Sequence, residues 1–323
     1  MDTGKNNVCR ICGCSDGLKS FDVKERQLNK GDSFKYILCP KCGCLQLADD
    51  VDNMSSFYGE SYYSFNVSSE DKTLTFFDKA ASRLLPRLNH IPVLVRMAFK
   101  RTGLIILQST RISRAGSIVD VGGGAGQFSH KLARLGFRDV STIDLYCKSS
   151  PYTDIHFYSC SLMDIENDKK YDLITFQDSF EHMNNPLEIL VKAGKLIKAG
   201  GVIAIQIPIV GLAWEVYSTN DYCIDAPRHY FIHTYDSMRF LCDKAGLEIT
   251  GIENDSSSGV YYKSENYRDT DLSLREIAEK MPSISRSERN RFRKMAIESN
   301  KNNKADHAIF YIKKKNTDKL GDR

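Results

Sequence analysis

The sequence predicts an α/β protein in which helices cover both faces of a mostly parallel sheet, preceded by a small cysteine-rich module. Three observations support this prediction. From Gly116 onward, short runs rich in β-branched residues alternate with amphipathic helical segments, the pattern of repeated β-α-β units. A glycine-rich turn joins the first of these runs to the first helix. Six of the ten cysteines fall within the first 44 residues.

Length and composition limit the classes of protein to consider. The chain has 323 residues, enough for two domains at roughly 150 residues each. Hydrophobic residues make up 41% and charged residues 27%, as in a folded globular protein. No apolar run approaches the ~20 residues needed to cross a bilayer. The polar N-terminus lacks the apolar segment of a secretory signal, so we expect a cytoplasmic protein.

The first element is a zinc-ribbon-like module, expected over residues 1–56. The stretches Cys9 to Cys14 and Cys39 to Cys44 both read C-x-x-C-G-C, and 26 residues separate the two C-x-x-C pairs. Four thiolates with this spacing satisfy tetrahedral Zn²⁺, which would have a structural role here. The predicted ligands are Cys9, Cys12, Cys39 and Cys42. The alternatives are a swap in which Cys14 or Cys44 replaces a ligand, a ribbon without metal, and a redox pair.

Residues 57–115 are expected to form a helical linker or cap. Apolar residues recur at i, i+3 and i+4 from Phe76 onward. The stretch 83–114 holds seven basic residues and no acidic ones, which suits RNA, a nucleotide-linked sugar or peripheral contact with an anionic membrane. The alternative is a solvated helix face. The basic positions are Arg83, Arg87, Arg96, Lys100, Arg101, Arg111 and Arg114.

Residues 116–315 carry the sheet. The predicted strands are 117–121, 140–144, 156–159, 171–176, 202–207, 247–253 and 307–312. A polar insertion, 254–306, separates the last two strands, and two helices are expected in it, at 272–280 and 286–300, because a structureless loop of that length would be unusual. Residues 316–323 are expected to be a disordered tail.

The most informative segment is the turn after the first strand. Strand 117–121 leads into Gly-Gly-Gly-Ala-Gly at 122–126, where a ligand can approach main-chain amides. Asp144 ends the second strand, where a carboxylate can accept both ribose hydroxyls of an adenosine-containing ligand. Asp120 precedes the first glycine by two residues. A carboxylate there suits a ligand with positive groups better than a pyrophosphate.

These motifs resemble those of class I S-adenosylmethionine (SAM)-dependent methyltransferases. Residues 120–126 are similar to motif I of that family, residues 171–182 to its fourth-strand segment, and residues 196–201 to the turn before its fifth strand, with Ala199 replacing the usual proline. The resemblance covers about residues 116–313. It implies a Rossmann-like seven-stranded sheet of order 3-2-1-4-5-7-6 with an antiparallel last strand. More narrowly, the cysteine module and the Tyr-rich stretch after it resemble bacterial enzymes that methylate sugars or polysaccharide precursors.

The resemblance also implies roles for residues at the carboxyl ends of the strands. The glycine loop would face the methionine part of SAM, Asp144 would hold the ribose, and the segment after the third strand would border the adenine. Gln177 and Asp178 would lie near the methionine amino group or the sulfonium. The expected cofactor-binding residues are Asp120, Gly122, Gly123, Gly124, Gly126, Asp144, Leu162, Met163, Gln177 and Asp178.

Methyl transfer to a sugar hydroxyl or to carbon needs a base. His182, after the fourth strand, and His229, beyond the fifth, are the two candidates, and the alternative for each is a structural histidine. Arg228 and Tyr230 are expected to bind the acceptor, because an arginine there can pair with a phosphate or carboxylate. In a further alternative, the D-x-x-E-H sequence at 178–182 binds Mg²⁺ or another divalent ion that activates the acceptor.

The predicted function is SAM-dependent methyl transfer to a small molecule, with a nucleotide-linked sugar or a surface-polysaccharide precursor as the leading acceptor. One alternative is an RNA methyltransferase that holds RNA with the zinc ribbon and the basic helices, although the aromatic and basic pattern of RNA-binding modules is absent. Another is a non-catalytic SAM-binding scaffold. The sequence leaves open the atom that is methylated and the oligomeric state.

Overall fold

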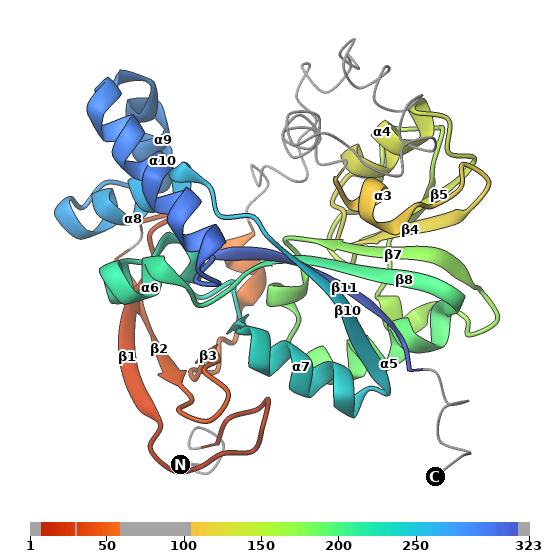
Figure 1. The fold of residues 1–323 in the computed structure, drawn as a ribbon, viewed down its shortest axis with the longest axis horizontal. Coiled ribbons are helices and arrows are strands. Elements are labelled where there is room, and N and C mark those ends of the chain that lie inside the picture. The colour runs from red at the N-terminus through yellow and green to blue at the C-terminus, as the bar shows by residue number, and fades with distance from the viewer. Residues whose placement is uncertain (1–7, 30, 59–104, 316–323) are drawn as a thin grey trace.

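The computed structural model describes residues 8–29, 31–58 and 105–315, and two sheets organise them (Figure 1). The larger sheet has seven strands in the order β10-β11-β8-β7-β4-β5-β6, and the smaller has four in the order β1-β2-β3-β9. The strands of the larger sheet are β4 (Ser117–Val121), β5 (Asp139–Ile143), β6 (His156–Tyr158), β7 (Tyr171–Gln177), β8 (Ile197–Pro208), β10 (Leu247–Asn254) and β11 (His307–Lys314).

The order and direction of these strands confirm the predicted α/β fold. Neighbouring strands from β6 through β5, β4 and β7 to β8 are parallel, whereas β11 is antiparallel to both β8 and β10. Numbered along the chain within this sheet, the order is 3-2-1-4-5-7-6. Strand β8 begins earlier than expected. Its pairing with β7 starts at Tyr171–Ile197 and jumps to Leu173–Val202, so the intervening turn forms an irregularity within the strand.

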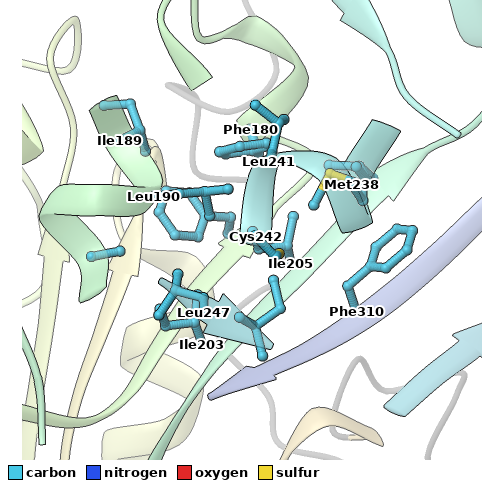
Figure 2. Close-up of a cluster of buried hydrophobic side chains, with 14 of the residues drawn as sticks. Phe180, Ile189, Leu190, Ile203, Ile205, Met238, Leu241, Cys242, Leu247 and Phe310 are labelled. Atoms are coloured by element: carbon cyan, nitrogen blue, oxygen red, sulfur yellow. The ribbon is translucent and has the colours of Figure 1, made fainter. Parts of the chain in front are cut away.

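Alternating residues of the strands pack two helical layers against the sheet. Helices α5 (Pro186–Leu196) and α7 (Tyr235–Lys244) cover one face, where Ile203 and Ile205 of β8 lie among Leu190 and Leu241 (Figure 2). Helices α3 (Ile105–Thr110) and α4 (Gln127–Arg134) cover the other face, where Ala204 is buried. Apolar residues on both sides of the central strands thus bury the middle of the sheet, whereas the edge strands β6 and β10 are partly exposed.

The smaller sheet joins the cysteine-rich module to the rest of the chain. Strands β1 (Lys19–Lys24), β2 (Ser33–Leu38) and β3 (Leu45–Leu47) form an antiparallel meander, and β9 (Phe231–Ile232) completes it by pairing with β3. A small apolar core packs against this sheet and contains both Tyr36 of β2 and Ile224. The module is therefore stabilised by a strand that lies far away in the sequence.

The insertion between β10 and β11 contains three helices, α8 (Ser258–Asp269), α9 (Leu274–Lys280) and α10 (Arg286–Lys301). They gather at one end of the molecule, with α6 (Leu212–Tyr217) at their base (Figure 1). The two predicted helices correspond to α9 and α10, and α8 was not predicted. Its buried residues include the adjacent Tyr261 and Tyr262, so α8 lacks the single apolar stripe that marks an amphipathic helix.

Part of the predicted linker, the basic positions from Arg83 to Arg101 and the tail 316–323 lie outside the described residues. In the described part of the chain, no helix combines the length and apolarity needed to span a bilayer. Short 3-10 helices occur at Met54–Phe57, Leu162–Asp164, Phe180–His182, Ser218–Asn220, Tyr222–Ile224 and Met281–Ser283.

Candidate active site

A cavity of about 970 Å³ lies at the carboxyl ends of β4, β5 and β7. In an open α/β sheet this edge, at the point where the strand order reverses, is where ligands bind. The residues singled out from the sequence that line it are Asp120, Gly122, Gly123, Asp144, Leu162, Met163, Gln177, Asp178, His182 and Tyr230. Four others do not line this cavity: Gly124, Gly126, Arg228 and His229.

The glycine loop is shaped by close packing at its first and last glycines. Gly122 has φ +72°, and a Cβ atom there would lie 2.6 Å from the Cβ of Ser179. Gly126 has φ +92° and precedes α4, and its Cβ would lie 2.5 Å from Ile155 Cδ1. Only glycine adopts this backbone without strain. The buried loop glycines Gly124 and Gly126 therefore shape the turn while Gly122 faces the cavity.

Asp144 is fixed at the tip of β5 by main-chain amides. Its Oδ2 accepts a hydrogen bond from Gly124 N at 2.8 Å, and its Oδ1 accepts from Tyr146 N at 2.9 Å and Cys147 N at 2.8 Å. The carboxylate thus ties the glycine loop to the segment after β5. Each carboxylate oxygen has two lone pairs, and the three amide bonds use three of the four, so one acceptor position, on Oδ2, remains for a hydroxyl group of a ligand in the cavity.

Large apolar side chains stand exposed at the wall of the same cavity. Leu145 is 57% exposed, Tyr146 52% and Met163 45%, whereas Leu162 is buried. Exposed apolar surface in a concave site suits a flat, weakly polar ligand group. Leu145 and Tyr146 were not singled out from the sequence, although their position directly after Asp144 could have indicated them.

Asp120 lies buried in the wall beside the glycine loop. Its Oδ1 accepts a hydrogen bond from Thr175 Oγ1 at 2.7 Å. Burial raises the pKa of Asp120 to about 7, and hydrogen bonds from Thr175 and Gln177 oppose this shift. A positively charged ligand group near Asp120 would favour the ionised carboxylate.

Asp178 follows β7 in a left-handed backbone conformation, with φ +48°. Its Oδ1 lies 2.6 Å from His307 Nε2, at the start of β11. Desolvation is the largest single influence and would raise the pKa of Asp178, but the charge and the hydrogen bond of His307, together with the nearby His229 and His182, lower that pKa overall. The pair likewise raises the pKa of His307 against its own desolvation. His307 was not predicted, since nothing around it in the sequence indicates a partner near Asp178.

A second cavity, of about 330 Å³, shares Asp178 and His182 with the first. His182 Nδ1 lies 3.0 Å from the carbonyl oxygen of Arg228 and 3.0 Å from Tyr58 Oη. A carbonyl only accepts hydrogen bonds, so Nδ1 carries the proton and the neutral ring has its lone pair on Nε2. Burial lowers the pKa of His182 to about 3, which keeps the ring neutral near pH 7.

His229 lines only the second cavity, with its ring centre 4.6 Å from that of His182. Its Nδ1 lies 2.8 Å from the carbonyl oxygen of Cys223, and its Nε2 lies 3.6 Å from Asp225 Oδ2. Burial also lowers the pKa of His229 to about 3. His229 therefore stands behind His182 as seen from the first cavity.

Arg228 has partners within the protein. Its side chain is 4% exposed, and its Nη2 donates to Asp225 Oδ2 and Gln27 Oε1. An internal carboxylate, that of Asp225, thus pairs with Arg228. The phosphate or carboxylate of an acceptor, expected from the sequence as its partner, stays a prediction. Tyr230, the other residue expected to bind the acceptor, lines the first cavity.

Three side chains near the junction of the cavities could hold a divalent ion. Glu181, His182 and His229 each place one ligand atom within 4.8 Å of the others. Glu181 is 1% exposed, and its Oε2 has no hydrogen-bond partner among the described residues. Carboxylate and imidazole together suit several divalent transition metals. The predicted D-x-x-E-H set changes in one member, because Asp178 turns to His307 and His229 takes its place.

The four predicted zinc ligands converge in the N-terminal module. Sγ of Cys9 lies 3.6 Å from that of Cys42, and Sγ of Cys12 lies 3.6 Å from that of Cys39. Tetrahedral Zn²⁺ with bonds of about 2.3 Å places its sulfur ligands ~3.8 Å apart, so the cluster fits this ion. A hydrogen bond from Cys42 lowers the pKa of Cys9 to about 5 and raises that of Cys42.

The remaining two cysteines of the repeat close the turns with their main chains. Cys9 N donates to Cys14 O at 2.8 Å, and Cys39 N donates to Cys44 O at 3.0 Å. Their thiols point to backbone carbonyls, that of Asp16 for Cys14 and that of Leu45 for Cys44. The ligand swap that the sequence left open therefore finds no support in this geometry.

The sheet order, the glycine loop at its carboxyl edge and Asp144 at the tip of β5 define a class I SAM-dependent methyltransferase domain. Residues 96–251 match a protein-family model described as "Methyltransferase domain". The chain thus contains a methyltransferase domain of this class, and its N-terminal part carries a four-cysteine cluster that is consistent with a zinc ribbon.

Curated relatives include ubiquinone biosynthesis O-methyltransferases. The protein of that name from Xanthomonas oryzae pv. oryzae is 31% identical over 110 residues, which cover 30% of this chain and 46% of the relative. That from Azoarcus sp. is 25% identical over 189 residues, 51% of this chain and 78% of the relative. The chain thus spans a little under half the length of the first of these relatives.

Among solved structures, the O-methyltransferase of a trans-AT polyketide synthase multienzyme from Brevibacillus brevis, in complex with S-adenosyl-L-homocysteine, is 14% identical. The match covers 72% of this chain and 79% of that chain, with a TM-score of 0.45.

Proposed function

We propose that the protein transfers the methyl group of SAM to a hydroxyl group of a small molecule, with a nucleotide-linked sugar as the leading acceptor. The observation that carries the proposal is the position of His182, which lines both the large cavity beside the glycine loop and the polar second cavity. A base at this junction can serve a cofactor in one cavity and an acceptor in the other.

The residues of the first cavity suit the parts of SAM in turn. In this proposal Asp144 would accept from a ribose hydroxyl, Leu145 and Met163 would border the adenine, and Asp120 would face the positively charged methionine amino group. All four residues line the first cavity. SAM supplies a methyl group that its sulfonium already activates. The protein's task is therefore to align the acceptor, exclude water and remove a proton, and alignment alone is worth several kcal/mol.

The proton of the acceptor hydroxyl goes to Nε2 of His182. The hydrogen bond from Nδ1 to the Arg228 carbonyl keeps Nε2 unprotonated and fixes the ring. A positioned general base contributes roughly 10²–10⁴-fold to the rate. A divalent ion held by Glu181, His182 and His229 would instead lower the pKa of the acceptor hydroxyl. Transfer that continues unchanged in Glu181→Gln, which removes one ligand of this ion and leaves the four-cysteine cluster intact, would exclude this second mechanism.

Zn²⁺ in the four-cysteine cluster would be structural. Four thiolates leave no open position for a substrate, as is typical of structural zinc sites. The metal would stabilise the two C-x-x-C turns, and the strands of the module pair with β9, which follows directly after Tyr230 in the wall of the first cavity.

The test supplies purified protein and methyl-labelled SAM with two separate pools, both from cells that lack the protein. One pool is a small-molecule extract rich in nucleotide-linked sugars, and the other is total RNA. We expect label in the nucleotide-sugar fraction. Label in RNA would replace the proposal with the RNA methyltransferase alternative. SAM binding without labelled product in either pool would favour the non-catalytic scaffold.

A further inference from the structure

The second cavity is a composite of segments that lie far apart in the sequence. Gln27 comes from the turn after β1, His182 from the segment after β7, Arg228 from the segment before β9, Leu274 from the start of α9 and His307 from β11. Its volume of about 330 Å³ lies at the lower end of the ~300–1,000 Å³ typical of small-molecule sites.

The turn after β1 is anchored to the helical insertion. Arg26 Nη2 donates to the carbonyl oxygen of Tyr267 at 2.8 Å, and its Nη1 lies 3.2 Å from Asp271 Oδ1. The backbone oxygen of Arg26 accepts from Leu274 N at 3.1 Å. The Arg26 side chain is 11% exposed and that of Asp271 is 87% exposed, so the bond to the Tyr267 carbonyl is the better shielded of the two side-chain contacts. Arg26 therefore holds the N-terminal module and the insertion together over the cavity.

The charges that line the cavity are mostly negative. Its four carboxyl groups belong to Asp178, Glu181, Asp225 and Asp255. Burial raises the pKa of Glu181 well above its ordinary range and favours its uncharged form, which leaves three carboxylates. Two cationic side chains oppose them, since His307 pairs with Asp178 and Arg228 pairs with Asp225. A carboxylate or phosphate inside this cavity would meet more like charges than opposite ones, which is costly.

Three side chains that line the same cavity, Glu181, His182 and His229, each have an acceptor atom within 4.8 Å of the others. The Nδ1 atoms of His182 and His229 lie against backbone carbonyls, which leaves both Nε2 lone pairs for a ligand. Glu181 adds a buried oxygen without a hydrogen-bond partner among the described residues. Hydroxyl and amino groups of a ligand would supply the missing donors.

We propose that the turn after β1 and the helical insertion close an acceptor site in the second cavity, and that this site selects rings bearing hydroxyl or amino groups against rings bearing a carboxylate. Gln27 is its specificity-determining residue from the N-terminal module, and Arg26 positions Gln27. The inference rests on the proposed function in one respect only: the bound ring is taken to be the methyl acceptor. Any phosphate of a carrier has to lie outside this cavity.

Saturation-transfer difference NMR of the full chain tests this with D-glucose and with two probes that each differ from it in one substituent, D-glucosamine and D-glucuronate. We expect saturation transfer to glucosamine and glucose and at least a threefold weaker effect on glucuronate. Gln27→Ala should weaken the glucose signal at least threefold. Leu28→Ala, which alters an exposed neighbour outside the cavity, should leave it unchanged. Gln27→Glu keeps an oxygen for Arg228 and should weaken glucuronate binding further.

An equal or stronger glucuronate signal, no signal from any probe, or a Gln27→Ala variant that matches the wild type would overturn the inference. Thermal unfolding of each variant shows whether it is folded. The measurement needs no turnover, so the two proposals fail separately. Sugar binding without methyl transfer would contradict the proposed function, and methyl transfer with glucuronate preferred would contradict only the selectivity proposed here.

Discussion

The two cavities of this protein are built in different ways. Apart from Tyr58 and Tyr230, every residue that lines the first cavity lies between Asp120 and Ile189. The second cavity draws its walls from residues as distant as Gln27 and His307. The first follows from one run of β-α-β units, whose loops meet at one sheet edge. The second exists only because the whole fold brings an N-terminal module against a C-terminal insertion.

Metal removal should have the largest effect, and on the acceptor side only. Structural zinc sites contribute on the order of 10 kcal/mol to the folding of their modules. We therefore expect chelation to lower methyl transfer by at least ~100-fold while the SAM dissociation constant changes less than about threefold. A methyl-transfer assay measures the first effect and calorimetric titration of SAM the second, with the metal content determined by mass spectrometry.

Cys12 and Cys14 provide a matched pair for this prediction. Cys12→Ser removes a proposed ligand and should reproduce the effect of chelation, whereas Cys14→Ser alters a thiol outside the cluster and should retain bound zinc and activity. Equal loss of zinc in both variants would show that Cys14 is a ligand. If loss of the metal also lowered the affinity for SAM, the cysteine-rich module and the SAM site would not be separable in function.

Replacing the proposed base comes next. His182→Gln should lower the methyl-transfer rate by roughly 10²–10⁴-fold, the usual contribution of a general base. SAM affinity should stay within about twofold, since the lost function is proton removal. His156→Gln, an exposed histidine on β6, is the control. A larger loss in His229→Gln than in His182→Gln would transfer the role of base to His229.

Gly122→Ala probes the cofactor side alone. The methyl group would combine φ +72° with a 2.6 Å approach to Ser179 Cβ, a strain of about 1–3 kcal/mol. We expect roughly tenfold weaker SAM binding. Gly136 has φ +94° but no atom closer than 3.6 Å to its built Cβ. Gly136→Ala should therefore lower the free energy of unfolding without weakening SAM binding, and equal effects of the two variants on SAM binding would contradict this account of the loop.

The sheet and most of the residues that line the first cavity could be predicted because local sequence specifies their positions. Strand 117–121, the glycines after it and Asp144 all lie within one β-α-β unit, so their spacing already places them at one sheet edge. Each copy of the cysteine repeat likewise specifies one turn of the four-cysteine cluster. In each case the interacting groups are near neighbours in the chain or belong to a repeated local motif.

The rest depends on contacts between distant segments. Strand β9 has only two residues and exists because β3 offers it a free edge. His307 and Gln27 reach the second cavity through the packing of β11 against β8 and of the first hairpin turn against α9, and no period or motif marks either residue. Helix α8 was missed because it is buried on more than one side.

The pH dependence of stability should show the smallest effect, carried by the Asp178–His307 pair. The raised pKa of His307 contributes stability that is fully present below its ordinary value of 6.5 and is lost as the pH rises through the raised value. The lowered pKa of Asp178 contributes stability above 3.8 that is lost as the pH falls through the lowered value. The pair therefore stabilises most between these two ordinary values.

Urea unfolding of wild type and His307→Gln at pH 5.5 and pH 8.5 measures this contribution. The side chain of Asp178 is 49% exposed, so screening should keep the difference in the free energy of unfolding below ~1 kcal/mol. We expect the wild type to be favoured at the lower pH and the difference to shrink at the higher one. The same difference at both pH values would show that His307 acts without its charge.

Calorimetric titration of SAM into the wild type, Asp144→Ala and Gln27→Ala tests the central claim most directly. Loss of one charge-assisted hydrogen bond at about 1.5–3 kcal/mol predicts roughly 10- to 150-fold weaker binding to Asp144→Ala. Gln27→Ala, altered only in the second cavity, should bind SAM like the wild type. Wild-type affinity in Asp144→Ala would contradict the assignment of the first cavity to SAM.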